Sequence, residues 1–296
     1  MKALVTGANG QLASDLVPLL EAAGFTPVPF ASAELDISIE AAVFEAVKRT
    51  RPGVIVNAAA YTKVDLAEKE KERAYAVNAS GAAFLARAAK ESGCPIVHVS
   101  TDFVFDGRSP VPYAEEAEVN PLSVYGASKL AGENAVAEAT EAHIIVRTSW
   151  LYGAAGHNFV KTILRLASER ETFRVVYDQT GTPTWSADLA AAIVKICGAL
   201  KAGQRPWGLY HYSNEGVASW YDFAVAICEE AAASGMSLKC NHIEPILTSE
   251  YPVPATRPAY SVLNKAKIKK TFNTLIPHWR RSLSTMLKEL KGKDNA

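Results

Sequence analysis

Along the first half of the chain, short runs rich in β-branched residues alternate with longer alanine-rich segments. This alternation constrains the fold more than any other feature, because it is typical of a parallel sheet covered by helices on both faces. Strands are expected at Lys2–Thr6, Thr26–Phe30, Val54–Asn57, Ile96–Ser100 and Ile144–Arg147. Helices are expected at Gln11–Ala23, Ile39–Thr50, Asp65–Ser92 and Leu122–Glu138. The sequence therefore predicts an α/β fold with a doubly wound parallel sheet.

The pattern becomes less regular after residue 150. Helices are expected at Phe159–Ser168, Ser186–Leu200, Ser219–Ala233 and Arg280–Leu290, and strands at Phe173–Val176 and Leu209–Tyr212. Proline-rich loops interrupt these elements. We interpret residues 151–296 as a smaller C-terminal α/β lobe that mainly binds substrate, and we expect some of its segments to return to the sheet formed by residues 1–150.

Composition excludes several classes of protein. The chain has 296 residues, 49% of them hydrophobic, and its 31 Lys and Arg balance its 31 Asp and Glu. This apolar content argues against intrinsic disorder, and zero net charge gives no general attraction to nucleic acid. The cysteines lie far apart without metal-ligand spacing, and no stretch reaches the roughly 18 apolar residues of a membrane helix. We expect a cytoplasmic protein with reduced thiols.

The first predicted strand runs directly into a glycine-rich turn, which reads TGANGQLA at residues 6–13. Glycines such as Gly7 and Gly10 let the backbone turn tightly and approach a pyrophosphate, and the following helix N-terminus supplies free N–H groups. The spacing is GxxGxxA, from Gly7 through Gly10 to Ala13, and not the GxGxxG of the commonest dinucleotide fingerprint. Its place between the first strand and the first helix still favours a Rossmann-type cofactor site.

Three further segments lie near the expected cofactor. Residues 57–62 follow the third strand at the sheet edge that lines the ligand crevice, although a plain strand-to-helix connection would look the same. Asp36 and Ile37 suit either a place beside an adenine ring or, for Asp36, the N-cap of the next helix. The second strand ends at Phe30-Ala31-Ser32 without an acidic residue, which would reject a 2′-phosphate, so this end favours NADP(H).

Tyr125 and Lys129 form the most informative pair. They stand four residues apart on a predicted helix and so share one face. An ammonium beside a phenol lowers the pKa of the phenol and suits it for proton transfer. Thr101, after the fourth strand, offers a hydroxyl at the same crevice. An ordinary surface pair is the alternative, but the hydroxyl, Tyr125 and Lys129 together predict an active site.

A series of longer motifs spans nearly the whole chain in order. They are GANGQL at 7–12, LDI at 35–37, VNAAAYTKVDLAE at 56–68, STDFVFDG at 100–107, NPLSVYGASKLAGE at 120–133, RTSWLYG at 147–153, NFVKTIL at 158–164, DQTGTPT at 178–184 and RPAYSVL at 257–263. Together they resemble the extended short-chain dehydrogenase/reductases and, within them, the dTDP-4-dehydrorhamnose reductase group. STDFVFDG, RTSWLYG and DQTGTPT are the motifs most specific to that group.

The resemblance implies reduction of the C4 ketone of dTDP-4-dehydro-β-L-rhamnose to dTDP-L-rhamnose, with NADPH as cofactor and NADH also admitted. It implies that Tyr125 gives a proton to the carbonyl oxygen. Lys129 would hold the nicotinamide ribose and lower the pKa of Tyr125, and Thr101 would polarise the carbonyl or orient Tyr125. The positions that contact the sugar in this group correspond to Thr101, Asp102 and Trp150. Cofactor contacts carry over to Gly10, Gln11, Leu12, Asp36, Ile37, Ala60, Tyr61, Thr62, Tyr125 and Lys129.

Partners and metals are less strongly implied. The expected partner is a dTDP-sugar substrate, with no nucleic acid and no membrane. Some members of the resembling group form homodimers bridged by Mg²⁺ through carboxylates. Asp15 matches one of those positions, but the others have no assigned counterpart, so no metal ligands are predicted.

Two rival functions remain open. Another nucleotide-sugar enzyme of the same fold, an epimerase or a 4,6-dehydratase, would share many motifs. Dehydratases of this fold use an Asp-Glu pair after the hydroxyl, whereas here Phe103 follows Asp102. The other rival is a non-catalytic regulatory subunit like that of methionine adenosyltransferase. The intact set of Thr101, Tyr125 and Lys129 disfavours it.

Overall fold

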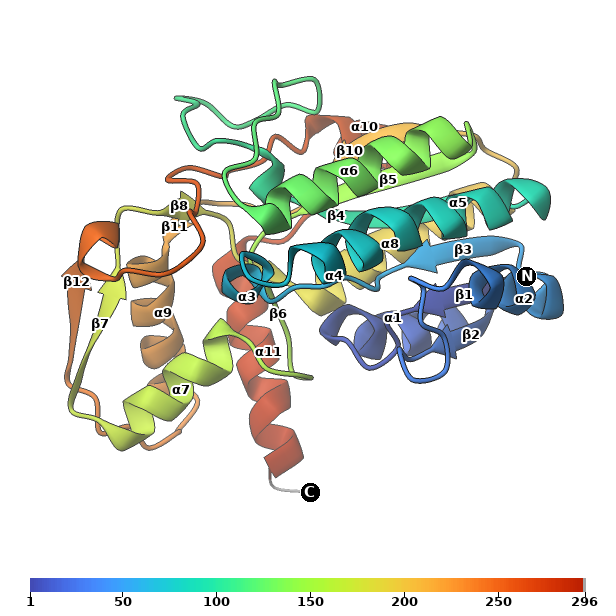
Figure 1. Ribbon diagram of the computed structural model, residues 1–296. Helices are drawn as coiled ribbons and strands as arrows, with labels where there is room; N and C mark the ends of the chain where they lie inside the picture. Colours follow the sequence, from blue (N-terminus) through green and yellow to red (C-terminus); the bar gives the residue numbers. More distant parts are fainter. Residues whose placement is uncertain (295–296) are drawn as a thin grey trace.

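A six-stranded parallel sheet, in the order β10-β5-β4-β3-β1-β2, forms the centre of the computed structural model, which describes residues 1–294 (Figure 1). Its strands are β1 (Lys2–Thr6), β2 (Thr26–Phe30), β3 (Val54–Asn57), β4 (Ile96–Thr101), β5 (His143–Thr148) and β10 (Gly208–His211). The chain places β2 on one side of β1 and β3 on the other. Such a reversal of strand order marks the edge at which doubly wound sheets bind ligands. The predicted fold class is confirmed.

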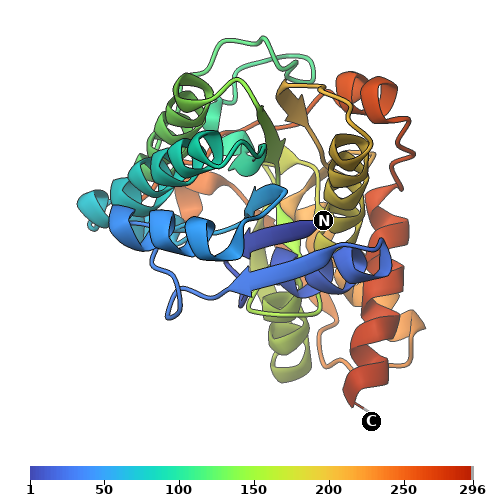
Figure 2. The same cartoon turned by 90° about the vertical axis from the view of Figure 1, so that its right-hand side faces the viewer.

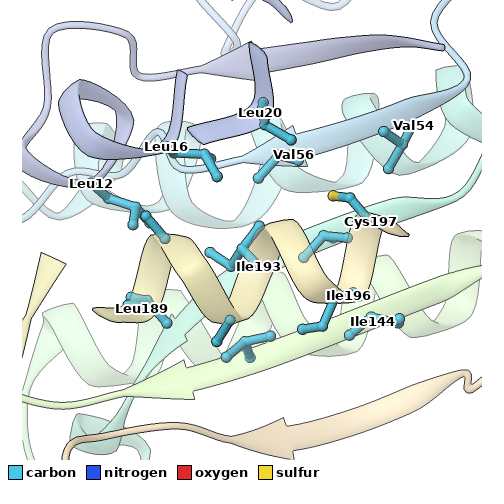
Figure 3. Close-up of a cluster of buried hydrophobic side chains, with 14 of the residues drawn as sticks. Leu12, Leu16, Leu20, Val54, Val56, Ile144, Leu189, Ile193, Ile196 and Cys197 are labelled. Atoms are coloured by element: carbon cyan, nitrogen blue, oxygen red, sulfur yellow. The ribbon is translucent and has the colours of Figure 1, made fainter. Parts of the chain in front are cut away.

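Helices cover both faces of this sheet (Figure 2). One layer consists of α2 (Glu40–Thr50), α5 (Gly81–Glu91) and α6 (Val124–Ala139), and the other of α1 (Gln11–Ala22), α8 (Ser186–Lys201) and α10 (Ala266–Phe272). In the second layer, Leu16 of α1 and Ile193 of α8 pack over Val56 of β3 (Figure 3). All three side chains are fully buried, and burying one such side chain contributes about 1.5–3 kcal/mol.

The helix predicted at Asp65–Ser92 is broken into four pieces, which corrects that prediction. They are α3 (Val64–Ala67), α4 (Lys71–Tyr75), a π-helical turn (Ala76–Ser80) and α5. The π turn carries Asn78, whose side chain bonds both the N–H and the C=O of Tyr61 and also Ser128 on α6. Gly132 lets α6 approach the Asn78 carbonyl. The π turn therefore places Asn78 where its side chain links the backbone of Tyr61 to α6.

The C-terminal half forms a second lobe and also completes the first (Figure 1). In this lobe, α7 (Phe159–Glu169) and α9 (Trp220–Ala233) pack against a small sheet of β7 (Thr172–Val176) and β12 (His242–Ile246), and α11 (Trp279–Asp294) packs against α9. Four two-residue strands connect the two parts. They are β6 (Leu151–Tyr152), β8 (Thr180–Gly181), β9 (Thr184–Trp185) and β11 (Ala218–Ser219). Because β10 pairs with β5, part of the chain beyond residue 150 belongs to the main sheet.

Besides the two-residue strands, two longer elements were not expected from the sequence. The strand β12 reads HIEPI, so its pattern is interrupted by a proline, and α10 is lysine-rich with only Ile268 and Phe272 buried. The last two residues of the predicted lobe, 295–296, lie outside the described residues. Within residues 1–294, no helix is long and apolar enough to cross a membrane.

Candidate active site

A cavity of about 850 Å³ lies along the carboxyl ends of the main strands, where the second lobe begins. It is lined by every residue predicted for the site: Gly7, Gly10, Gln11, Leu12, Asp36, Ile37, Ala60, Tyr61, Thr62, Thr101, Asp102, Tyr125, Lys129 and Trp150. The structure thus brings together segments that are far apart in the sequence. The individual role of each residue stays a prediction.

The glycine turn has the geometry of an anion site. Gly7 has φ +73°, and a Cβ there would stand 2.8 Å from the carbonyl oxygen of Ala58. Only glycine fits this position without strain. Gly10 caps α1 without a side-chain hydrogen bond, so the N–H groups of the first turn stay free for a phosphate. Ala13 is buried, and its methyl group packs into the core beneath the turn. The residues present therefore fit a dinucleotide.

The end of β2 lies beside the same cavity. Ser32 is exposed and lines it, whereas Ala31 is buried. Asp36 accepts hydrogen bonds from the N–H and the hydroxyl of Ser38, and the N-cap of α2 is Ile39. Asp36 is therefore not the helix cap; it lines the cavity, and its place beside an adenine ring stays a prediction.

Tyr125 lies in the first turn of α6. This helix begins at Val124 because the Ser123 hydroxyl accepts a hydrogen bond from the N–H of Gly126. The ring of Phe103 packs edge-on against Tyr125 at 5.4 Å between centroids. These contacts hold the phenol at the cavity, next to Thr101.

The Thr101 hydroxyl both donates and accepts a hydrogen bond. Its Oγ1 donates to Asp102 at 3.1 Å and accepts from the N–H of Phe103 at 3.2 Å. Burial raises the pKa of Asp102 to about 6, although the hydroxyls of Ser261 and Thr101 favour its ionised form. When Asp102 is ionised, the hydroxyl proton of Thr101 points at the carboxylate.

The predicted lowering of the Tyr125 pKa by Lys129 is wrong for this structure. Burial raises the pKa of Tyr125 to about 12, and the charge of Asp102 adds to this against the lowering effect of Thr101. The Lys129 ammonium points elsewhere: it donates to the Val99 carbonyl at 2.6 Å. Its own pKa falls to about 8 through burial, which the charge of Glu133 only partly offsets. Tyr125 is consequently held as a neutral phenol.

A buried ion pair lies behind the site and was not predicted. Arg147 on β5 binds both carboxylate oxygens of Glu133 on α6, with the shortest distance 2.7 Å. Ser100 donates to the same carboxylate at 2.5 Å. Glu133 follows Lys129 by four residues, so the helical spacing of Tyr125, Lys129 and Glu133 was the available signal. The pair ties α6 to β4 and β5.

Trp150 is stacked rather than free. It has φ +46°, and its ring lies 3.6 Å from that of Trp220 at an angle of 5°. A Cβ on Gly181 would come within 2.6 Å of the Trp150 ring, so glycine is needed for this close approach. Trp220 and Phe159 line the same cavity and were not among the predicted site residues. Trp150 therefore meets the cavity as part of an aromatic group.

Metal ligands are not gathered at this site. Among residues 1–294, no group of three or more His, Cys, Asp or Glu side chains is placed to hold an ion. Asp15 accepts a hydrogen bond from Ser186 at 2.5 Å, which connects α1 to the start of α8.

Fold and site together define a Rossmann-type oxidoreductase that uses a nicotinamide dinucleotide. The family described as RmlD substrate binding domain matches residues 1–291. A dTDP-4-dehydrorhamnose reductase from Aggregatibacter actinomycetemcomitans is 43% identical over 285 residues, covering 96% of this chain and 97% of the relative. The chain belongs to the RmlD family, the dTDP-4-dehydrorhamnose reductases, as the motifs indicated.

Solved structures give the same result. A dTDP-4-dehydrorhamnose reductase from Clostridium acetobutylicum superimposes with a TM-score of 0.92 at 40% identity, covering 98% of this chain and 100% of the other. The enzyme of that name from Bacillus anthracis, solved in complex with NADP, gives a TM-score of 0.90 at 40% identity over 97% of this chain and 99% of the other.

Proposed function

We propose that this protein uses NADPH to reduce the C4 ketone of dTDP-4-dehydro-β-L-rhamnose, giving dTDP-L-rhamnose. The observation that carries the proposal is that one cavity joins the glycine turn to Thr101, Tyr125 and Lys129 in a chain that matches this family over residues 1–291. The cofactor, when bound, supplies the hydride that reaches C4.

The side chains of the protein supply the proton and the positioning. Tyr125, kept neutral by burial, donates its Oη proton to the carbonyl oxygen as that oxygen gains negative charge. Thr101 orients the phenol. Polarising the carbonyl would require the Thr101 proton, and that proton is directed at Asp102. Of the two roles considered for Thr101, orientation therefore has the better support. Lys129, fixed at the Val99 carbonyl, lines the same cavity and would hold the nicotinamide ribose there.

Cofactor choice provides a first test. Ser32 stands at the end of β2 on the cavity wall, where a carboxylate would face a 2′-phosphate. We expect Ser32→Asp to lower kcat/KM for NADPH by about tenfold or more and to leave NADH little changed, because only NADPH carries the repelled charge. Steady-state kinetics with both cofactors measure this, with Ser32→Asn as the neutral control. Equal losses with both cofactors would place the 2′-phosphate elsewhere.

The aromatic group provides a second test. Trp150→Ala removes the ring on which Trp220 is stacked. We expect the KM for the dTDP-sugar to rise about tenfold while NADPH affinity stays within about twofold, since the ring lies on the substrate side. Separate titrations of the two ligands, together with thermal melting, measure this. Trp207→Ala, in the packing around α8, is the control. A large loss of stability with unchanged sugar affinity would make Trp150 a packing residue only.

The rival functions predict different outcomes with a panel of dTDP- and UDP-linked 4-keto sugars. A reductase oxidises NADPH stoichiometrically with the ketone, whereas an epimerase consumes no net NADPH. A regulatory subunit binds the nucleotide without turnover. Phe103, packed against Tyr125, supplies neither an acid nor a base for a dehydratase.

The roles of the two parts of the chain, the assembly and the location of the protein are also proposals. Residues 1–150 would hold the cofactor, and residues 151–296 would mainly hold the sugar, apart from the segments that complete the main sheet. We further propose a homodimer acting in the cytoplasm. Sedimentation of the purified protein tests the assembly.

A further inference from the structure

A chain of buried polar side chains crosses three strands beneath the cavity. Thr6 ends β1, Asn57 ends β3 and His98 lies on β4, and each is 1% exposed. The Thr6 hydroxyl donates to Asn57 Oδ1 at 2.7 Å, and Asn57 Nδ2 lies 3.0 Å from His98 Nδ1. His98 Nε2 lies 3.5 Å from Nζ of Lys129. The reduction described above uses only the last of these four residues.

One backbone group fixes the direction of every hydrogen bond in this chain. The N–H of Ala59 is shared between Asn57 Oδ1 at 3.2 Å and Thr6 Oγ1 at 3.3 Å, and a backbone N–H can only donate, so the Asn57 atom beside it is the oxygen. The Asn57 amide nitrogen is therefore the end that faces His98, so His98 Nδ1 must accept. The proton of the neutral ring then sits on Nε2. Burial holds the pKa of His98 well below its ordinary value, which keeps a second proton off the ring.

The Nε2–H group of His98 consequently faces Lys129. An ammonium group has three N–H donors and no lone pair, so this contact opposes the charged form of Lys129 and suits the neutral amine. The Val99 carbonyl accepts from Lys129 in either form. The other ionisable or charged groups around Lys129 are Tyr125 one turn before it, Asp102 on the cavity wall, and Glu133 one turn after it, which Arg147 binds.

We propose that His98 is a positioning residue for this reaction. Asn57 holds His98 as its Nε2–H tautomer, and in this form His98 makes the Lys129 ammonium lose its third proton more easily. The proposal rests on the proposed function, in which Tyr125 loses a proton at each turnover. A lysine that releases a proton easily can pass one from Nζ to water in the cavity, and that water can give a proton to the Tyr125 phenolate, which restores the phenol and leaves an amine able to accept from His98. A proton taken up from bulk solvent then restores the ammonium.

Nitrogen-15 NMR of the wild-type protein tests the tautomer without any assay of activity. We expect the His98 ring to show a protonated Nε2 and an unprotonated Nδ1. In Asn57→Asp, the carboxylate still accepts from Thr6 and Ala59 but cannot donate, so the proton should move to Nδ1. An Nδ1–H tautomer or an imidazolium in the wild-type protein would overturn the proposal.

The pH dependence of kcat/KM tests the effect on Lys129. In His98→Gln, an amide oxygen can accept from the ammonium, so the alkaline limb should move upward by about one pH unit. The control is His143→Gln, a half-buried histidine on β5 bonded to the Thr140 carbonyl, which should leave the limb in place. An unmoved limb in a folded His98→Gln would make His98 purely structural. Absence of reductase activity in the wild type would instead refute the proposed function, and the NMR result would still decide the tautomer.

Discussion

Tyr125→Phe is expected to lower kcat by about 10²-fold or more, because the ring keeps its packing but loses the only proton it can donate. NADPH affinity should change little. Stopped-flow measurement of NADPH oxidation in the presence of the keto sugar gives the rate, and fluorescence titration gives the affinity.

Tyr113→Phe is the matched control for this variant. The Tyr113 ring is buried against Phe105, and its hydroxyl donates to Asp106, so the same atom is removed away from the cavity. Its turnover should stay close to wild type. A Tyr125→Phe enzyme with near wild-type turnover would remove Tyr125 from the mechanism.

Arg147→Met is expected to lower the free energy of unfolding by about 3–5 kcal/mol, because it leaves the Glu133 carboxylate buried without its cation. The two side chains are only 4% and 5% exposed and make three hydrogen bonds to each other. Urea denaturation followed by circular dichroism measures the change.

The exposed pair of Arg165 and Glu169 offers the control, because its side chains are 57% and 51% exposed. Arg165→Met should cost no more than about 0.5 kcal/mol, as exposed pairs of this spacing contribute little. If Arg147→Met were equally mild, the buried pair would not hold α6 against the sheet.

Local signals account for the parts of the fold that the sequence predicted. The strand Val54–Asn57 was predicted with its observed bounds, because short buried runs between helices can be recognised without knowledge of their neighbours. The glycine turn was recognisable for a similar reason, since the conformation of Gly7 is a property of the backbone. These signals were sufficient to place the cavity at the carboxyl edge of the sheet.

The remaining features depend on contacts between distant segments. The pKa of Tyr125 follows from burial and from where Lys129 points, and neither is visible in the spacing of the two residues along a helix. Trp220 is 70 positions from Trp150, and their stacking depends on how the second lobe closes on the first. Asn57 and His98 meet only because β3 and β4 are neighbours in the sheet.

Transfer of deuterium from NADPH that carries deuterium at both positions of nicotinamide C4 tests the central claim most directly. The protein is incubated with this cofactor and dTDP-4-dehydro-β-L-rhamnose, and the product is analysed by mass spectrometry and NMR. A reductase that delivers hydride to the ketone gives dTDP-L-rhamnose with one deuterium, located at C4 of the sugar. Unlabelled product, or binding of both ligands without oxidation of the cofactor, would contradict the assignment.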